Sequence, residues 1–533
     1  PDDEMREIFV PVELMAKMME IKWLGNKAKQ GFYKRTQEAD GKKAKLVLDY
    51  NTMEYLPAGN PKFASVSDAM KKADDGVAAT LKVMFNGTDV AADLTREYLC
   101  NNFIYAANRV PEICENIAGI DNAVKWGFNH QLGPFETWDA IGVRETVEVM
   151  KKLKKKIPKK VEEMLKKGCE SFYLKKEDGI YIYDFEKKDY VKLEENLRII
   201  LLPDLKDRNK VVKKNASATL VDIGDGVACL EFHTKMNAVD DGMIEMIFDS
   251  CNIVEKDFTG MVVGNHETNF SVGANIFMVL LAIQKGDWDI IEQLVAAFQN
   301  ANMRMKYLSK PVVTAPAGLA LGGGCEMAMH GAKCQPYGET YIGLVEVGVG
   351  VIPAGGGCKE LMVRMTEGLP DGVIDAGMNL QQVYAKAFEN LAMAKVAMSA
   401  VEGMELGYIR KTENISLSRN QQLWDAKQAV LGLAKFYRKP RPVMIPVMGE
   451  NFRGMVEAIL YNMRQGNYAS DYDVHVSRKV AYILSGGDCA EGTLVTEEEI
   501  LALEREAFLS LCGEKKTQDR IMHMLNTGKP LRN

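Results

Sequence analysis

The spacing of apolar residues changes along the chain, and a change near residue 215 separates two kinds of predicted structure. Before it, residues 93–167 carry apolar side chains at intervals typical of helices, with a break or kink expected at Pro111. In residues 168–200, Tyr181, Tyr183 and Phe185 alternate with other residues, which predicts a short strand or hairpin. Residues 93–200 are therefore expected to form a mainly helical domain.

After residue 215 the pattern becomes that of an α/β domain. Residues 218–232 alternate around Gly224-Asp225-Gly226, which predicts a β-hairpin. Valine-rich strands are then expected at 260–264 and 311–317, each followed by a helix, and such a repeat is typical of α/β domains. Amphipathic helical patterns dominate from about residue 376 to the end, as at residues 380–404 and 497–511.

Composition and charge narrow the class of protein. With 533 residues, of which 47% are hydrophobic and 26% charged, the chain can form several domains with cores of their own. Its formal net charge of -6 argues against a general affinity for nucleic acid. The longest apolar run, residues 276–283, is far shorter than the ~20 residues of a membrane helix and is interpreted as a core segment.

Cysteine and histidine spacing gives no sign of a metal site. The ten cysteines show no repeating CxxC pattern and are interpreted as reduced thiols in a cytoplasmic protein. His266-Glu267 begins like a zinc-binding helix, but no second histidine follows four positions on. No metal is therefore expected.

Two glycine-containing segments, residues 269–275 and 317–326, have features of the same kind of binding site. Each follows a predicted strand and opens a predicted helix, where free N–H groups and the positive end of the helix dipole are available. Two such N–H donors directed at one oxygen would form an oxyanion hole. For Gly322-Gly323-Gly324 alone, a tight turn is an equally good interpretation. A nucleotide-binding loop is not indicated, because the glycines do not have the G-x-G-x-x-G spacing.

Two glutamates accompany these glycines. Glu326 directly follows them in the first turn of the predicted helix, and Glu346 lies in the otherwise apolar run 343–350. An acid in apolar surroundings costs free energy unless it is paired or used in chemistry. One such acid alone would more often be an exposed edge residue, but two beside a glycine-rich helix start indicate general acid and base catalysis.

These segments together resemble the crotonase (enoyl-CoA hydratase) superfamily. Residues 270–275 are similar to its first oxyanion-hole motif, residues 310–326 to its second, and residues 352–357 to the turn after its second acid. Asn275 departs from the family, which usually has Asp there. The resemblance implies an α/β crotonase fold, a ββα superhelix.

The resemblance also implies roles for individual residues. Ala274 and Gly323 would donate backbone N–H groups to a thioester oxygen. Glu326 and Glu346 would hold and activate a water molecule, with Glu346 as the acid and Glu326 as the base.

Contacts with coenzyme A follow from the same resemblance. Val272 would help to seat the adenine through its backbone, next to Ala274. Lys235 would reach the CoA phosphates, and an ordinary surface lysine is an equal alternative.

A second resemblance concerns the helical part. Residues 24–33 are similar to the end of the all-α C-terminal domain of 3-hydroxyacyl-CoA dehydrogenases, and residues 107–111 and 120–139 are similar to a second copy of it. Tandem copies followed by a crotonase domain resemble the bifunctional proteins of fatty-acid β-oxidation. The chain begins with Pro1, and no strand followed by G-x-G-x-x-G opens it, so we interpret it as a fragment without the NAD-binding domain.

The two resemblances set the expected domains and cofactors. No cofactor is expected in this fragment, since CoA arrives with the substrate and NAD would belong to the full-length protein. The expected domains are a first dehydrogenase remnant at 1–36, a connector at 37–92, a second dehydrogenase-type domain at 93–200, a crotonase core at 215–375 and its helical C-terminal part at 376–533.

The expected function is hydration of 2-enoyl-CoA to 3-hydroxyacyl-CoA. The alternatives are a 3,2-enoyl-CoA isomerase and a non-catalytic scaffold that binds acyl-CoA. The expected partners are an acyl-CoA substrate, further copies of the chain in a homo-oligomer, and a thiolase in a β-oxidation complex. Neither a nucleic acid nor a membrane span is expected.

Overall fold

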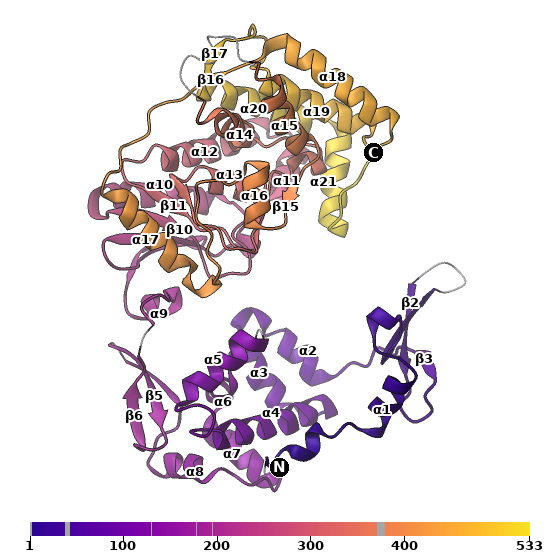
Figure 1. Cartoon of the computed structure of the whole chain (residues 1–533), viewed down its shortest axis with the longest axis vertical. Coiled ribbons are helices and arrows are strands. Elements are labelled where there is room, and N and C mark those ends of the chain that lie inside the picture. The colour runs from indigo at the N-terminus through magenta and orange to yellow at the C-terminus, as the bar shows by residue number, and fades with distance from the viewer. Residues whose placement is uncertain (1–2, 38–42, 129, 177, 195, 370–378) are drawn as a thin grey trace. The chain divides into compact units, whose positions relative to one another are not determined.

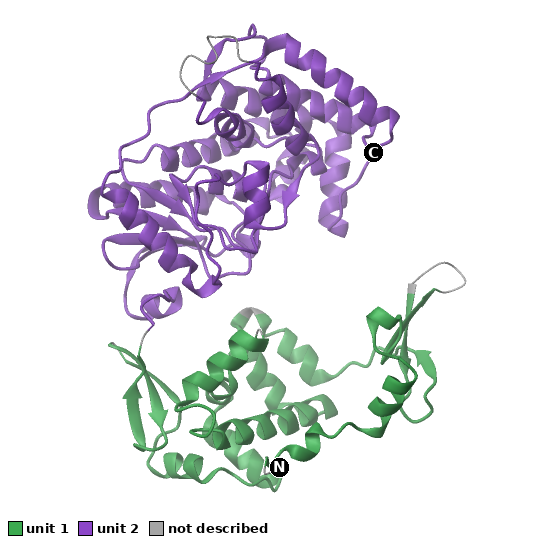
Figure 2. Ribbon diagram, viewed as in Figure 1, with its two compact units in different colours: residues 1–195 green, residues 196–533 purple. Residues whose placement is uncertain are grey.

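The chain divides into two compact units, residues 1–195 and residues 196–533 (Figure 2). The computed structural model describes residues 3–37, 43–128, 130–176, 178–194, 196–369 and 379–533. No helix among these residues is long and apolar enough to cross a membrane. The boundary expected between residues 375 and 376 lies outside the described residues.

Unit 1 consists of packed helices and two three-stranded antiparallel sheets (Figure 1). Its core is aromatic: the rings of Phe103 and Trp138 stack with centroids 5.0 Å apart, and both side chains are fully buried. The helices are α1 Glu13–Glu20, α2 Ala64–Met70, α3 Val77–Asn86, α4 Val90–Asn108, α5 Ile117–Phe128, α6 Pro134–Ile141, α7 Val143–Lys152 and α8 Lys159–Lys166, with 3-10 turns η1 Arg6–Phe9, η2 Asn26–Ala28 and η3 Ala73–Asp75. The strands are β1 Tyr33–Gln37, β2 Lys43–Leu48, β3 Tyr55–Pro57, β4 Tyr173–Lys176, β5 Gly179–Asp184 and β6 Asp189–Lys192.

The helices predicted for residues 93–167 are confirmed by α4 to α8, and the strand predicted around Tyr181 is confirmed by β5. Residues 37–92, expected to be a connector, contain β2, β3, α2 and α3 within this unit.

Unit 2 is built around a six-stranded sheet in the order β13-β11-β10-β9-β8-β7. Strands β9, β10, β11 and β13 run parallel, whereas β7 and β8 are antiparallel to their neighbours. The hairpin predicted at residues 218–232 is confirmed as β8 and β9. The strands of the sheet are β7 Val211–Lys214, β8 Ala218–Asp222, β9 Val227–Phe232, β10 Gly260–Val263, β11 Val312–Thr314 and β13 Lys333–Cys334.

Both faces of this sheet are covered by helices. Alternate residues of a strand point to opposite faces. Leu220 and Leu230 therefore join the larger core, which includes α10 (Asp241–Asp257), while Val221 and Cys229 pack in a second core against α17 (Gln422–Ala434). Smaller sheets complete the unit, one in the order β12-β14-β15 and a pair of β16 with β17. Their strands are β12 Leu319–Leu321, β14 Tyr341–Gly343, β15 Val396–Ala397, β16 Met444–Pro446 and β17 Leu494–Thr496.

The helices of unit 2 differ from the prediction in two places. The apolar run 276–283, interpreted as a core segment, forms α11, but Phe277 and Met278 are about half exposed there, at 50% and 53%. The pattern at 380–404 is interrupted by β15. The helices are α9 Leu202–Asp207, α10 Asp241–Asp257, α11 Ile276–Lys285, α12 Trp288–Lys306, α13 Gly323–Met329, α14 Gly357–Thr366, α15 Gln381–Ala392, α16 Ala400–Leu406, α17 Gln422–Ala434, α18 Gly449–Gln465, α19 Asp471–Leu484, α20 Glu497–Cys512 and α21 Lys515–Thr527, with 3-10 turns η4 Lys235–Asn237, η5 Glu346–Val349 and η6 Arg419–Gln421.

Candidate active site

Two parallel strands bring Glu326 and Glu346 to the same place. Strands β12 and β14 pair in parallel, with Leu321 opposite Gly343, so their carboxyl ends meet at one edge. The chain after β12 turns at Gly322 into α13, whose first turn carries Glu326, and the chain after β14 enters η5 at Glu346. A Cβ atom placed on Gly322 would lie 2.7 Å from Oε1 of Glu346, which shows how closely Glu346 approaches the glycine turn that precedes Glu326.

The Glu326 carboxyl group is buried and held by backbone N–H groups. Its Oε1 accepts hydrogen bonds from Gly355 N at 2.7 Å and Gly357 N at 2.8 Å, and the residue is 2% exposed. Burial raises the pKa of Glu326 to about 7, while these two N–H donors and the nearby Lys359 ammonium act in the opposite direction. Glu326 therefore keeps its proton to higher pH than an exposed glutamate does.

Glu346 lies in a different environment, although it is chemically the same group. Its Oε2 is buried and has no hydrogen-bond partner among the residues that the structure describes. Burial raises the pKa of Glu346 well above its usual range, and the negative charge of Glu326 adds to the rise. Of the two acids, Glu346 thus retains its proton to higher pH.

The first glycine segment runs alongside the second. Ser271 pairs in parallel with Ala320 of β12, so the chain from 271 to 274 heads for the same edge. Gly273 has a φ of 87°, and a Cβ atom on it would lie 2.7 Å from Gly323 N. Only glycine fits at this contact, because a side chain would collide with the neighbouring backbone.

Of the two predicted N–H donors, Gly323 lies at a helix N-terminus and Ala274 lies just before one. Ala274 immediately precedes Asn275, the N-cap of α11, and Gly323 is the first residue of α13. The first N–H groups of a helix have no acceptor within it and carry the positive end of its dipole. The segments that contain them are in backbone contact at Gly273, as required if both donors are to reach one oxygen.

Val272 and Lys235 lie on adjoining loops. The Val272 N–H donates to Met236 O at 3.4 Å, in the loop that Lys235 opens, and Val272 is half-buried while Lys235 is exposed. The structure therefore places Lys235 on the surface beside the first glycine segment, which leaves both interpretations of this lysine open.

Three buried side chains near the acids were not singled out by the sequence. Phe298 of α12 fills the space between Gly323 and Gly355, since Cβ atoms on these glycines would lie 3.2 Å and 2.4 Å from its ring. His330 Nδ1 donates to Glu326 O at 2.6 Å, because a backbone carbonyl can only accept. Glu504 of α20 is fully buried against the turn that holds Glu326. Aromatic and charged residues at helical spacing give no signal that distinguishes these three from ordinary core or surface positions.

The described residues contain no group of three or more histidine, cysteine, aspartate or glutamate side chains placed to hold a metal ion. His266, the residue that began the zinc-like pattern, instead hydrogen-bonds Ile200 O at 2.9 Å.

Comparison with known proteins gives two family matches. Residues 226–400 match the enoyl-CoA hydratase/isomerase family, and residues 99–184 match the 3-hydroxyacyl-CoA dehydrogenase C-terminal domain. The chain is also similar in structure to an enoyl-CoA hydratase from Rhodobacter sphaeroides, with a TM-score of 0.43 and 14% identity over 60% of this chain and 92% of that one.

Two relatives align with nearly the whole chain. A "Probable 3-hydroxyacyl-CoA dehydrogenase" of Bacillus subtilis is 38% identical over 100% of this chain and 65% of its own length. A "Putative fatty acid oxidation complex trifunctional enzyme" of Rickettsia felis is 24% identical over 98% of this chain and 63% of its own length. The chain thus spans somewhat less than two thirds of the length of these relatives.

Proposed function

We propose that the chain hydrates 2-enoyl-CoA thioesters to 3-hydroxyacyl-CoA, because it carries a match to the 3-hydroxyacyl-CoA dehydrogenase C-terminal domain followed by a match to the enoyl-CoA hydratase/isomerase family. The observation that carries this proposal is the convergence of the buried Glu326 and the half-buried Glu346 with two helix N-termini. Glu326 and Glu346 follow parallel strands, and the N-terminal ends of α11 and α13 are in contact at Gly273. This arrangement supplies both acid-base groups and fixed donors for a negative oxygen.

In the proposed reaction the thioester oxygen accepts hydrogen bonds from Ala274 N and Gly323 N. Water adds its oxygen to C3 of the double bond, and the electron pair moves through C2 onto the thioester oxygen. The two N–H groups stabilise this enolate because they point at the oxygen before the charge develops. Loss of one such donor costs about 10²–10³-fold in kcat in a well-studied case.

The environments of the two acids support the division of their roles. Glu326, with two N–H donors and Lys359 nearby, ionises more readily and takes the proton from water. Glu346, without a partner on Oε2, keeps its proton and delivers it to C2. Water thus loses a proton to one carboxylate while C2 gains one from the other, and the hydrated product leaves with the elements of water added.

The experiment is a hydration assay that follows loss of the enoyl-thioester absorbance with crotonyl-CoA and longer enoyl-CoAs. We expect turnover by the wild type and a loss of about 10²–10⁴-fold in kcat for Glu326→Gln and for Glu346→Gln. A 3,2-enoyl-CoA isomerase would instead retain activity on 3-enoyl-CoA when Glu326 is replaced. Absence of turnover at every chain length, with binding of acyl-CoA retained, would support a scaffold.

The wider setting follows from the same proposal. The product belongs to the substrate class of a 3-hydroxyacyl-CoA dehydrogenase, the name carried by the Bacillus subtilis relative. In the full-length protein NAD would serve that oxidation and take no part in the hydration. We further propose that copies of the chain form a homo-oligomer and that a thiolase joins it in a fatty-acid oxidation complex, which size-exclusion chromatography with light scattering would test.

A further inference from the structure

The first turn of α14 is held by two carboxyl groups from different helices. Gly355 N and Gly357 N donate to Glu326, at 2.7 Å and 2.8 Å. Gly356 N and Lys359 N donate to Glu504, at 2.9 Å and 2.8 Å. The N–H groups along this turn are therefore shared between the proposed base on α13 and an acid on α20.

Glu504 satisfies N–H groups that would otherwise be buried without a partner. The initial N–H groups of a helix have no acceptor inside it, and those of α14 are buried with the turn. Glu504 is itself fully buried, and α20 lies well outside the matched residues 226–400. Glu504 and Glu326 accept hydrogen bonds from the same turn. A shift of this turn at Gly356 would therefore move the N–H groups that orient the Glu326 carboxyl.

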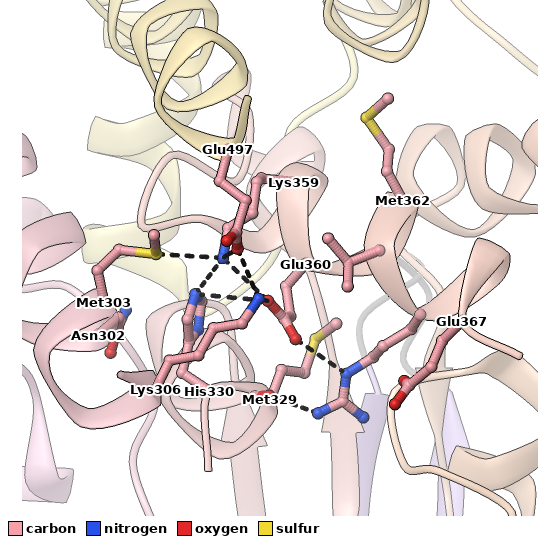
Figure 3. Close-up of polar contacts among 12 residues, drawn as sticks. Asn302, Met303, Lys306, Met329, His330, Lys359, Glu360, Met362, Glu367 and Glu497 are labelled. Atoms are coloured by element: carbon pink, nitrogen blue, oxygen red, sulfur yellow. Dashed lines mark hydrogen bonds and ion pairs between the residues drawn. The ribbon is translucent and has the colours of Figure 1, made fainter. Parts of the chain in front are cut away.

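A second connection reaches Glu326 from the same turn. The Lys359 Nζ donates to His330 Nε2 at 2.8 Å (Figure 3). His330 Nδ1 in turn donates to Glu326 O at 2.6 Å. The Lys359 ammonium is held in turn by Glu360 at 2.9 Å and Glu497 at 3.1 Å. Lys359 is thus held at its backbone N–H by Glu504 and at its ammonium group by Glu360 and Glu497. Its ammonium group is also connected through His330 to the backbone oxygen of Glu326.

The groups that face Glu504 come from four neighbouring elements. They are Glu326 of α13, Glu346 of η5, the Lys359 ammonium of α14 and the Gln299 amide of α12, whose Nε2 lies 3.5 Å from Glu504 Oε2. Burial raises the pKa of Glu504 to about 8, and the charge of Glu326 contributes to the rise. Glu326, which also accepts two N–H hydrogen bonds, therefore ionises more readily than Glu504.

We infer that Glu504 is a positioning residue for Glu326: it holds the Gly355–Lys359 turn in the conformation that presents two N–H groups to the Glu326 carboxyl. This inference rests on the proposed function, in which Glu326 is the base. A carboxyl at 504 is needed because both of its oxygens are used, one for Gly356 and one for Lys359. An amide of the same shape keeps only one acceptor.

The test compares Glu504→Gln with Glu506→Gln, an exposed acid two residues further on the same helix. For Glu504→Gln we expect kcat for crotonyl-CoA to fall about 10- to 100-fold with KM little changed, since the substrate contacts are intact and the base is misplaced. The acid limb of the pH profile should move to higher pH, because weaker N–H bonds stabilise the Glu326 carboxylate less. Glu506→Gln should match the wild type in both.

A purely structural role predicts another result. Glu504→Gln would then lower the melting temperature but leave kcat and the acid limb at their wild-type values, and that outcome would overturn the inference. Glu504→Asp, which keeps the carboxyl on a shorter side chain, should give an intermediate kcat, and it replaces the Gln variant if the latter does not fold.

An infrared pH titration of the carboxyl band, assigned with Glu326→Gln, separates this inference from the proposed function. A higher pKa of Glu326 in Glu504→Gln supports positioning even if the wild type has no hydratase activity. An unchanged pKa refutes it even if the wild type is an active hydratase.

Discussion

Removing two opposite charges together from the buried ion cluster beside Glu326 should cost less free energy of unfolding than the sum of the two single removals. The cluster consists of Lys306, Lys359, Glu360 and Glu497, whose side chains are 11%, 0%, 1% and 5% exposed (Figure 3). Within this group of four, two positive charges face two negative ones, and Arg364 and Arg410 lie 3.7 Å and 3.8 Å from the other oxygen of Glu360. Within the group of four, Lys306→Met leaves one negative charge in excess and Glu360→Gln leaves one positive charge, to which Arg364 adds. The double variant keeps Lys359 paired with Glu497 at 3.1 Å.

The magnitude follows from the geometry. Lys306 Nζ lies 2.8 Å from Glu360 Oε2, which corresponds to a gross attraction of about 6 kcal/mol at an effective dielectric constant near 20. Desolvation offsets part of this attraction, but a buried ion left without its partner typically destabilises a protein by about 3–5 kcal/mol. We expect each single variant to lose about that much, and the double variant to lose less than the sum by about 1–3 kcal/mol.

Hydrogen exchange of peptides from α12 and α14, measured by mass spectrometry, reports the opening free energy of this region. It is preferable to one global melting curve because the chain has two units, which need not unfold together. The control is the exposed pair Lys515 and Asp519 on α21, for which a coupling below about 0.5 kcal/mol is expected. Additive losses in the buried pair would refute the argument that charge balance stabilises the cluster.

Three further predictions concern catalysis. If Glu326 is the base, kcat/KM for hydration should rise with pH through about 7, because the base must lose its proton to act, and a flat profile from pH 5 to 8 would contradict this role. Gly273→Ala should lower kcat by about 10²-fold or more, because the new methyl group would lie 2.7 Å from Gly323 N. The control is Gly286→Ala, which should retain activity because Gly286 has a similar φ of 75° but no atom within 4 Å of the new methyl group. Lys235→Gln should raise KM for crotonyl-CoA by about 3- to 10-fold at unchanged kcat if this lysine contacts a CoA phosphate, and an unchanged KM would identify it as an ordinary surface lysine.

The features that the sequence could predict are those set by local pattern. The hairpin of β8 and β9 follows from alternation around a glycine turn, and the buried strands β10 and β11 follow from short valine-rich runs. The proximity of Glu326 to Glu346 depends on the parallel pairing of β12 with β14, which no local pattern contains. For that pairing the resemblance to a family was needed.

Buried charge was the main feature that the sequence could not reveal. Lys359 and Glu360 are adjacent charged residues, and such residues are almost always at the surface unless they are paired. Their partners, Lys306 and Glu497, lie on other helices and far along the chain. The prediction that residues 276–283 form a core segment was wrong for Phe277 and Met278 of α11, which are exposed. An apolar run alone does not show whether another part of the protein covers it.

Strand pairing brings the two proposed catalytic acids together, but it does not by itself determine their ionisation. Glu326 and Glu346 are identical side chains at the ends of paired strands, and they differ in the N–H groups available to each. Those N–H groups belong to a turn that Glu504 holds from 148 residues beyond Gly356. A chain ending after the matched residues 226–400 would retain both acids and both helix N-termini, yet it would lack the helix that holds the turn. Acid-base chemistry at this site therefore depends on α20 as well as on the strands that carry the acids.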